Sequence, residues 1–367
     1  MTSPADLDTP ALVLDLDVIE RNIAEMAQVA RAAGVRLRPH TKTHKSPLLA
    51  AMQVDAGAQG ITVAKLGEAE VMVDAGLDDV LVAYPLVGER KLLRLRALLE
   101  RASISVSLDA VEVAEGIGAV GTDLGRPVPV LVEVDTGHHR MGLPPGEPSV
   151  ALAMAIARVP GIEVIGLLTH AGHAYQAADP AELHRITERE ALDLIRTAER
   201  CREEGLELRE VSIGSTPTAR VGAQADGVTE IRPGTYIFND VQQMRLGVAP
   251  ESACGARILA TVVARPTAER FLIDAGSKAF SSDGGDGPPF PGRGVIAGRP
   301  DLVIDFTTEE HGVGHLTGDA ASLSIGDRLE VIPLHVCSAV NLFDIAYGVR
   351  DGLVERTIPI AARGRSQ

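Results

Sequence analysis

Basic residues are scarce in this chain of 367 residues, which has 35 Lys and Arg against 50 Asp and Glu and a net charge of −15. Nucleic acids and anionic membranes bind basic surfaces, so neither is expected as a partner. The sequence also lacks any run of about 18 apolar residues, which argues against a membrane-spanning helix. With 45% hydrophobic residues, the chain can build a large core and more than one domain.

Cysteine is also rare. Cys201, Cys254 and Cys337 are too few and too widely spaced for a disulfide framework. The opening residues, MTSPADLDTP, lack the basic segment and the apolar run of a secretory signal. These two absences predict a cytoplasmic protein with reduced thiols.

Short apolar segments alternate with amphipathic helical patterns up to about residue 240. Eight segments have the pattern of strands: 35–42, 60–65, 79–85, 103–108, 128–135, 162–170, 206–214 and 230–238. The clearest helical patterns between them cover 89–102 and 181–205. Eight such units predict an α/β fold of the TIM-type (β/α)8 barrel class. A doubly wound open sheet is the alternative, because alternation alone does not close a barrel.

The pattern changes after residue 250, where helical periodicity ends. Four further segments have the pattern of strands: 256–265, 270–278, 301–306 and 327–336. Together with a turn-rich loop at 281–294, they predict a C-terminal all-β domain. A lone strand at 10–16 precedes the first helix. The predicted domains are 1–17, a strand that joins the β domain, 18–245, the barrel, and 246–367, the β domain.

Polar residues gather where the predicted barrel strands end, which is where barrel enzymes keep their active sites. Lys42 ends the first strand, between His40 and His44. Arg140 follows the fifth strand, and His170, His173 and Tyr175 follow the sixth. We therefore expect these side chains to share one rim of the barrel.

The last two barrel strands end in glycine-containing turns, GST at 214–216 and RPGTY at 232–236. Glycine lets the backbone approach an anion closely, and N–H groups and hydroxyls can then bind it. The two turns predict a phosphate site, with ordinary tight turns as the alternative. A lysine at the tip of the first strand, opposite such a site, suggests a Schiff base with pyridoxal phosphate. An ordinary solvated lysine is the alternative.

A His-x-Cys motif lies at 335–337. Alternate residues on a strand share a face, so His335 and Cys337 are predicted to point the same way and to hold one metal ion. Imidazole and thiolate suit zinc. A buried structural His and Cys is the alternative.

Five motifs carry a resemblance to a known family: PHTKTHK (39–45), DTGHHRMG (135–142), SIGSTPT (212–218), EIRPGTYIFND (230–240) and HVCSAVNLFD (335–344). They resemble the pyridoxal-phosphate enzymes of the alanine-racemase-like barrel fold and, within it, the D-threonine aldolase and D-serine dehydratase group. The resemblance covers nearly the whole chain, including both predicted domains.

The resemblance implies a role for each matching residue. Lys42, rather than Lys45, is the Schiff-base lysine, and Arg140 holds the phenolate oxygen of the cofactor. Arg232 matches the arginine that faces the pyridine nitrogen in racemases. The phosphate group falls to the two turns, that is, to Gly214, Ser215, Thr216, Gly234, Thr235 and Tyr236. His335 and Cys337 match the ligands of the catalytic metal, zinc or manganese.

The resemblance also implies a lyase that acts on small D-3-hydroxy amino acids, and a homodimer. The catalytic tyrosine motif of the racemases is absent, which argues against racemization. We predict a D-threonine aldolase with His170 or His173 as the base. Cys337 and Tyr175 resemble the dehydratases, so a D-serine or 3-hydroxy-D-aspartate dehydratase is the alternative. Non-catalytic pyridoxal-phosphate carriers share the barrel, but they lack the β domain.

Overall fold

The computed structural model describes residues 3–283, 290–317 and 323–367. It divides into two compact units, which are taken one at a time below. Unit 1 comprises Met1–Ile23, Thr43–Ser46 and Thr235–Arg363, and unit 2 comprises Ala24–Lys42, Pro47–Gly234 and Gly364–Gln367. These bounds differ from those predicted from the sequence, chiefly because the chain crosses between the units at 42–47 as well as near 234. Part of the predicted turn-rich loop, 284–289, lies outside the described residues.

Unit 2 contains a sheet of eight strands in the order β2-β9-β8-β7-β6-β5-β4-β3, and every pair is parallel. The strands are β2 (Arg36–Leu37), β3 (Ile61–Val63), β4 (Asp79–Val82), β5 (Ser103–Leu108), β6 (Val128–Glu133), β7 (Ile162–Leu168), β8 (Glu210–Ile213) and β9 (Glu230–Ile231). A parallel bridge from His40 to Thr62 also connects the segment after β2 to β3.

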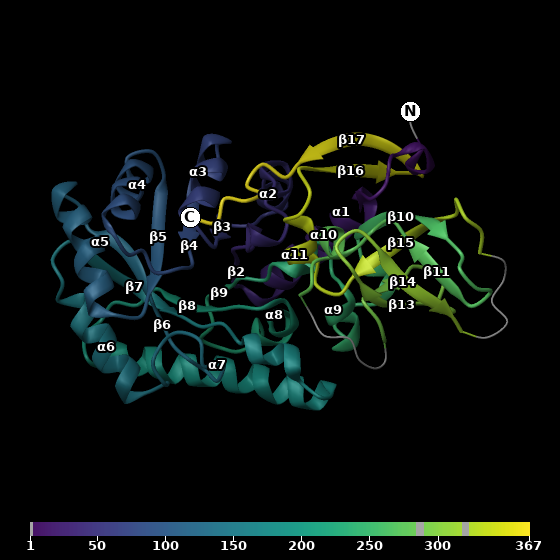
Figure 1. The fold of residues 1–367 in the computed structure, drawn as a ribbon. Helices are drawn as coiled ribbons and strands as arrows, with labels where there is room; N and C mark the ends of the chain where they lie inside the picture. The colour runs from purple at the N-terminus through teal and green to yellow at the C-terminus, as the bar shows by residue number, and fades with distance from the viewer. Residues whose placement is uncertain (1–2, 284–289, 318–322) are drawn as a thin grey trace. The chain divides into compact units, whose positions relative to one another are not determined.

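The helices of unit 2 follow the strands in turn, and consecutive helices from α3 to α8 contact each other on the outside of the sheet (Figure 1). They are α2 (Pro47–Asp55), α3 (Leu66–Asp74), α4 (Glu89–Leu99), α5 (Val111–Asp123), α6 (Glu147–Ala157), α7 (Pro180–Glu203) and α8 (Thr216–Gly222). Strand β4 is apolar on both faces, with Val80 and Val82 on one face and Leu81 on the other, and all three have no exposed surface, as parallel strands under a helical layer require. The predicted α/β unit with a curled parallel sheet is confirmed. Closure into a complete (β/α)8 barrel remains a prediction that the His40–Thr62 bridge supports.

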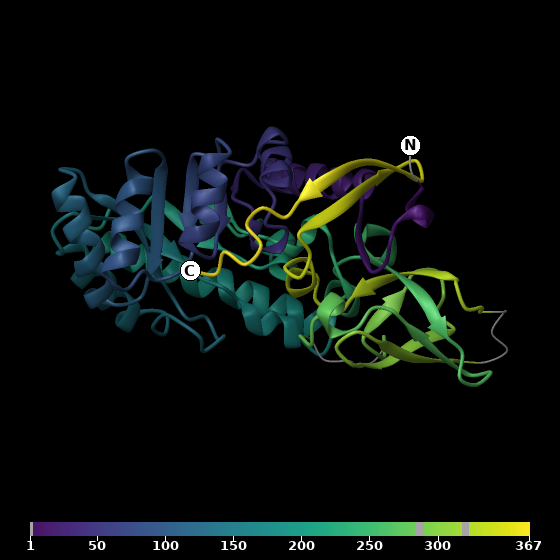
Figure 2. The same ribbon diagram turned by 45° about the horizontal axis from the view of Figure 1, so that its top comes forward.

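Unit 1 is built on a nine-stranded sheet in the order β11-β14-β13-β12-β15-β10-β1-β16-β17. Its strands are β1 (Ala11–Asp15), β10 (Ala256–Ala264), β11 (Arg270–Ile273), β12 (Gly294–Ile296), β13 (Leu302–Thr307), β14 (Gly312–Leu316), β15 (Arg328–Pro333), β16 (Ile345–Arg350) and β17 (Leu353–Pro359). The N-terminal strand β1 lies between β10, which is antiparallel to it, and β16, which is parallel. Figure 2 shows β16 and β17 as an antiparallel hairpin.

The core of this β unit is a cluster of apolar side chains from β10, β11, β13 and β15, including Ile258, Phe271, Ile304 and Val331. Three short helices accompany the sheet: α9 (Val241–Arg245), α10 (Ser277–Phe280) and α11 (Val336–Val340). Helix α1 (Leu16–Ala33) begins in unit 1 and ends in unit 2. Its apolar stripe is buried, with Ile19, Ile23, Met26 and Ala30 each at most 3% exposed.

Two predictions of local structure were wrong. The first barrel strand is only two residues long, and Lys42 lies in a 3-10 turn, Thr41–Thr43. The His-x-Cys motif is not on a strand: β15 ends at Pro333, His335 caps α11, and Cys337 lies inside that helix. Proline has no N–H group with which to continue a ladder. The backbone N–H of Val336 instead donates to the Asp240 carboxylate at 3.0 Å, which stabilises the start of α11.

Candidate active site

Strand register brings several predicted site residues of unit 2 to one end of its sheet. Leu168 pairs with Ser212, and Ser212 with Glu230, so these three side chains share a face. Two positions further along the same strands come His170, Gly214 and Arg232. The contacts agree: His170 Nδ1 lies 2.6 Å from the carbonyl oxygen of Gly214.

Lys42 belongs to the same group. Its positive charge, after burial, is the largest influence that lowers the pKa of both His40 and His170. Arg140 and Arg232 lower the pKa of both rings further. The rings are therefore neutral at pH 7. The structure thus gathers Lys42, Arg140, His170 and Arg232 as predicted, and it adds His40.

Arg232 is buried and makes two contacts through its terminal nitrogens. One nitrogen donates to the Ser212 hydroxyl, and Nη2 donates to the carbonyl oxygen of Thr169 at 2.6 Å. Burial lowers the pKa of Arg232, against the attraction of Glu230, Glu133 and Glu190. Gly214 packs against this side chain, since a Cβ at Gly214 would lie 3.1 Å from two Arg232 atoms. Glycine at 214 therefore leaves room for the arginine.

The loops after β6 and β7 interlock through two glycines. The His173 ring packs on Gly137, where a Cβ would come within 3.2 Å of it, and the His138 ring packs on Gly172, where a Cβ would come within 2.5 Å. His138 also meets His170 edge to face, with ring centroids 5.6 Å apart. Burial is the main cause that lowers the pKa of both His138 and His173. Tyr175 lies in the same 3-10 turn as His173, Gly172–Gln176.

Arg140 lies beside the carboxylate of Glu133. Its Nη2 is 3.2 Å from Glu133 Oε1. Burial raises the pKa of Glu133, although Arg140 opposes that shift. About half of the Arg140 side chain is exposed (47%), so the guanidinium remains open to a bound anion.

The two predicted phosphate turns fall in different units. Gly214, Ser215 and Thr216 are buried in unit 2, and the Ser215 hydroxyl lies 2.9 Å from the Thr218 hydroxyl. Gly234 ends its segment of unit 2, whereas Thr235 and Tyr236 form a 3-10 turn of unit 1. The Gly214 turn is buried and packs against Arg232.

The metal candidates lie in unit 1. Nδ1 of His335 is 2.5 Å from Asp283 Oδ2, and Cys337 Sγ is 3.2 Å from the Thr43 hydroxyl. Burial alone would lower the pKa of His335, but Cys337, Asp240 and Asp283 raise it to about 10. The negative neighbours of His335 would therefore attract a cation to this motif. Within the described ranges, no three His, Cys, Asp or Glu side chains are grouped as metal ligands.

Sequence reasoning missed polar residues in each of the two units. Glu133 and Glu190 are buried under the rim of unit 2, and Asp283 contacts His335 across 52 positions of the chain. Glu133 ends β6 and could have been found as a strand-end residue. A helical glutamate and a loop aspartate carry no such signal, because only the fold brings them to the site.

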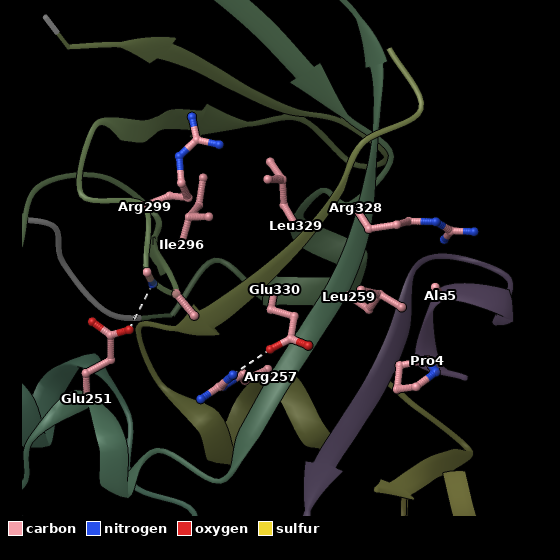
Figure 3. Close-up of a pocket in the computed structure, with 12 residues that line it drawn as sticks. Pro4, Ala5, Glu251, Arg257, Leu259, Ile296, Arg299, Arg328, Leu329 and Glu330 are labelled. Atoms are coloured by element: carbon pink, nitrogen blue, oxygen red, sulfur yellow. Dashed lines mark hydrogen bonds and ion pairs between the residues drawn. The ribbon is translucent and has the colours of Figure 1, made fainter. Parts of the chain in front are cut away.

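A cavity of about 600 Å³ lies in unit 1 and includes none of the predicted site residues (Figure 3). Its wall contains an ion pair between Arg257 and Glu330, whose nearest atoms are 2.5 Å apart. Arg299 and Arg328 also line it, but Figure 3 shows their guanidinium groups pointing away from each other. The cavity is therefore separate from the site described above.

Comparison with known proteins decides the family. Residues 14–242 match the model "Alanine racemase, N-terminal domain", and residues 255–349 match "Putative serine dehydratase domain". The chain belongs to the alanine racemase N-terminal domain family.

No helix among the described residues has the length and apolar character needed to cross a membrane.

One relative and two solved structures indicate the class of reaction. D-threo-3-hydroxyaspartate dehydratase of Delftia sp. (strain HT23) is 38% identical over 349 residues, covering 90% of this chain and 91% of that protein. The crystal structure of D-threonine aldolase from Filomicrobium marinum has a TM-score of 0.93 at 34% identity and covers 100% of this chain and 98% of its own. A cysteine-to-alanine mutant of D-threo-3-hydroxyaspartate dehydratase, in the metal-free form, has a TM-score of 0.91 at 36% identity and covers 98% and 99%.

These findings confirm the predicted resemblance. The chain is a lyase of D-hydroxy amino acids with an alanine-racemase-like fold, and pyridoxal phosphate is the cofactor that this family supports. The relatives include both aldolases and dehydratases, so the reaction is argued from the site itself.

Proposed function

We propose that this lyase is a D-threonine aldolase that depends on pyridoxal phosphate and a divalent metal. It would cleave the Cα–Cβ bond of a D-3-hydroxy amino acid to give glycine and an aldehyde. The observation that carries the proposal is a set of three histidines: burial lowers the pKa of His40, His170 and His173, and the charge of Lys42 lowers the pKa of the first two further. An aldol cleavage needs a neutral base for the β-hydroxyl proton, and these rings are neutral at pH 7.

The cofactor would be held by residues of unit 2. Lys42 supplies the amine for covalent attachment, and Gly214, Ser215 and Thr216 supply a buried turn for the phosphate. Arg140, half exposed, is placed to meet a phenolate oxygen. When bound, pyridoxal phosphate supplies an electron-accepting ring for the electron pair left at Cα. The predicted roles of Arg232, Gly234, Thr235 and Tyr236 remain part of the proposal.

His173 is the base that the geometry favours. Its ring packs on Gly137, and its Nδ1 is buried without a hydrogen-bond partner among the described residues. A neutral imidazole with a free lone pair can take the β-hydroxyl proton. Nδ1 of His170 is instead bonded to the carbonyl oxygen of Gly214. His170 is therefore better suited to holding the Gly214 turn than to accepting a proton.

The metal would be held by His335 and Cys337, with zinc or manganese as the candidates. Imidazole nitrogen and thiolate sulfur are zinc ligands, and a catalytic metal keeps positions open for water or substrate. Its chemistry would be that of a Lewis acid for the β-hydroxyl oxygen. The anionic neighbours Asp240 and Asp283, which raise the pKa of His335, support a cation there.

A dehydratase is the second candidate, because a thiolate ligand at 337 accompanies the 38% identity to D-threo-3-hydroxyaspartate dehydratase. In that reaction Lys42 would remove the Cα proton, and the β-hydroxyl would leave as water. The products would be a 2-oxo acid and ammonia. The predicted homodimer also remains a proposal, to be tested by sedimentation of the purified protein.

Incubation with D-threonine separates the two reactions in one tube. With pyridoxal phosphate and Mn²⁺ or Zn²⁺ present, the aldolase yields glycine and acetaldehyde, and the dehydratase yields 2-oxobutyrate and ammonia. Glycine as the main product supports the proposal. Predominant 2-oxobutyrate would reverse the order of the two candidates. D-threo-3-hydroxyaspartate, assayed in parallel, shows whether a side-chain carboxylate is preferred.

A further inference from the structure

Glu190 on helix α7 is a buried acid for which the proposed reaction has no direct use. Its side chain is 0% exposed, although its neighbour Arg189 lies on the outer face of the helix and pairs with Asp193. Burying an ionisable group is costly unless the group does something specific. Its contacts show what it does.

One carboxyl oxygen of Glu190 joins two loops of the site. Oε1 accepts hydrogen bonds from the backbone N–H of Ala171 at 3.2 Å and from that of Gly214 at 3.5 Å. Ala171 follows His170, and Gly214 opens the phosphate turn. The Thr218 hydroxyl also interacts with this carboxyl group and lies 2.9 Å from the Ser215 hydroxyl. The loops after β7 and β8 therefore share one anchor.

His170 binds the carbonyl oxygen of Gly214, whereas Glu190 binds its N–H group. Its Nδ1 lies 2.6 Å from the Gly214 carbonyl oxygen, and because a carbonyl only accepts, Nδ1 carries the proton. Gly214 is thus held at its nitrogen by Glu190 and at its oxygen by His170. Displacing Glu190 would free both the turn and the ring.

The surroundings of Glu190 favour its neutral form. Burial raises the pKa of Glu190, although Thr218, the Gly214 N–H and Arg232 act in the opposite direction. Its second oxygen, Oε2, has no hydrogen-bond partner in the part of the chain that the structure describes. An unpartnered buried oxygen is costly in either protonation state, and a negative charge beneath the turn would repel a phosphate.

We propose that Glu190 is a positioning residue for the cofactor phosphate: it holds the Gly214–Thr216 turn and the His170 loop in the arrangement that receives the anion. This inference rests on the proposed use of pyridoxal phosphate. The inference gives helix α7 a role in cofactor binding, although the outer face of that helix is charged.

The test is a titration of the apoenzyme with pyridoxal phosphate, followed by absorbance, on three variants. Glu190→Gln keeps the shape and an acceptor oxygen, so its affinity should stay within about threefold of the original. Glu190→Leu keeps the volume but loses the acceptor, and its affinity should fall on the order of tenfold or more. Glu199→Gln, at an exposed glutamate of the same helix, is the matched control and should bind like the original protein.

A second measurement distinguishes positioning from general stability. Nitrogen-15 NMR of the histidines should show His170 protonated at Nδ1 in the original protein and in Glu190→Gln, and a mixture of tautomers in Glu190→Leu. If Glu190→Leu does not fold, Glu190→Gln alone decides, since loss of affinity in that variant would contradict an anchoring role carried by the acceptor oxygen. Equal affinity of Glu190→Leu and the original protein would overturn the inference and leave the proposed function intact. An original protein that binds no pyridoxal phosphate would overturn both.

Discussion

The Nδ1 atom of His170 lies 2.6 Å from the carbonyl oxygen of Gly214, which joins the end of β7 to the turn that follows β8. This bond fixes the neutral tautomer of the ring and leaves Nε2 as an acceptor. His173, three residues later, has no such partner for its buried Nδ1 among the described residues. The two rings therefore differ: Nδ1 of His170 is engaged, whereas Nδ1 of His173 has no partner among the described residues, as its proposed role as the base requires.

The pH dependence of kcat/KM should follow from this division. Burial lowers the pKa of His173 below its ordinary 6.5, against a smaller raising contribution from Asp135. A base must be neutral, so activity should persist as the pH falls through 6.5 and decline only below it. His173→Asn should reduce kcat by about 10²–10⁴-fold. An acid limb centred above 6.5, or full activity of His173→Asn, would assign the base to another residue.

Metal binding should depend on Cys337 and not on the other two cysteines. Titration with Co²⁺ should produce a thiolate charge-transfer absorption in the original protein and none in Cys337→Ala. Cys201→Ala is the control, because burial raises the pKa of the Cys201 thiol to about 11 and keeps it protonated. An unchanged absorption in Cys337→Ala would show that the motif is structural.

Asp283 should strengthen metal binding through His335. Its Oδ2 is 2.5 Å from Nδ1 of the ring and also accepts a hydrogen bond from the Ser338 hydroxyl at 2.6 Å. A carboxylate on one nitrogen orients the other toward a metal, and losing it typically costs about 10–100-fold in affinity. Competition with a chelator should show that loss in Asp283→Asn. Asp305→Asn, at the carboxylate that pairs with His315, should bind like the original protein.

The stability of unit 2 should depend on a buried ion pair at the start of its strands. Nε of Arg38 lies 2.8 Å from Glu230 Oε2, and both side chains are at most 10% exposed. Arg38→Met would leave the buried Glu230 carboxylate with only the more distant Arg36, at 3.5 Å, and the Ser212 hydroxyl, and the free energy of unfolding in urea should fall by about 3 kcal/mol. Arg209→Met removes an exposed pair with Glu163 and should cost less than about 1 kcal/mol. Equal losses would contradict this account.

Strand ends were the part of the site that the sequence could predict. Lys42, Arg140 and His170 each follow an apolar segment, and parallel strands bring such ends to one edge. Glu190 was missed because it sits among charged residues on a helix whose pattern reads as solvated. Its burial depends on packing against loops that the local sequence does not describe.

Helix α11 was missed for a different reason. The segment HVCSAV is a short apolar run, and such a run is compatible with either a strand or a helix. The β16–β17 hairpin could have been found: Asp351 and Gly352 are an Asp-Gly pair between alternating segments, and both have positive φ, 50° and 72°, as a tight hairpin turn requires.

The central claim is that Lys42 holds pyridoxal phosphate. The measurement that tests it most directly is reduction of the cofactor-loaded protein with borohydride, followed by peptide mapping of the pyridoxyl group. Lys42 lowers the pKa of His40 and His170 and so lies among the site residues, whereas Lys45 is buried in unit 1. The account predicts modification at Lys42 and its disappearance in Lys42→Ala. A label on Lys45, or on no lysine, would contradict it.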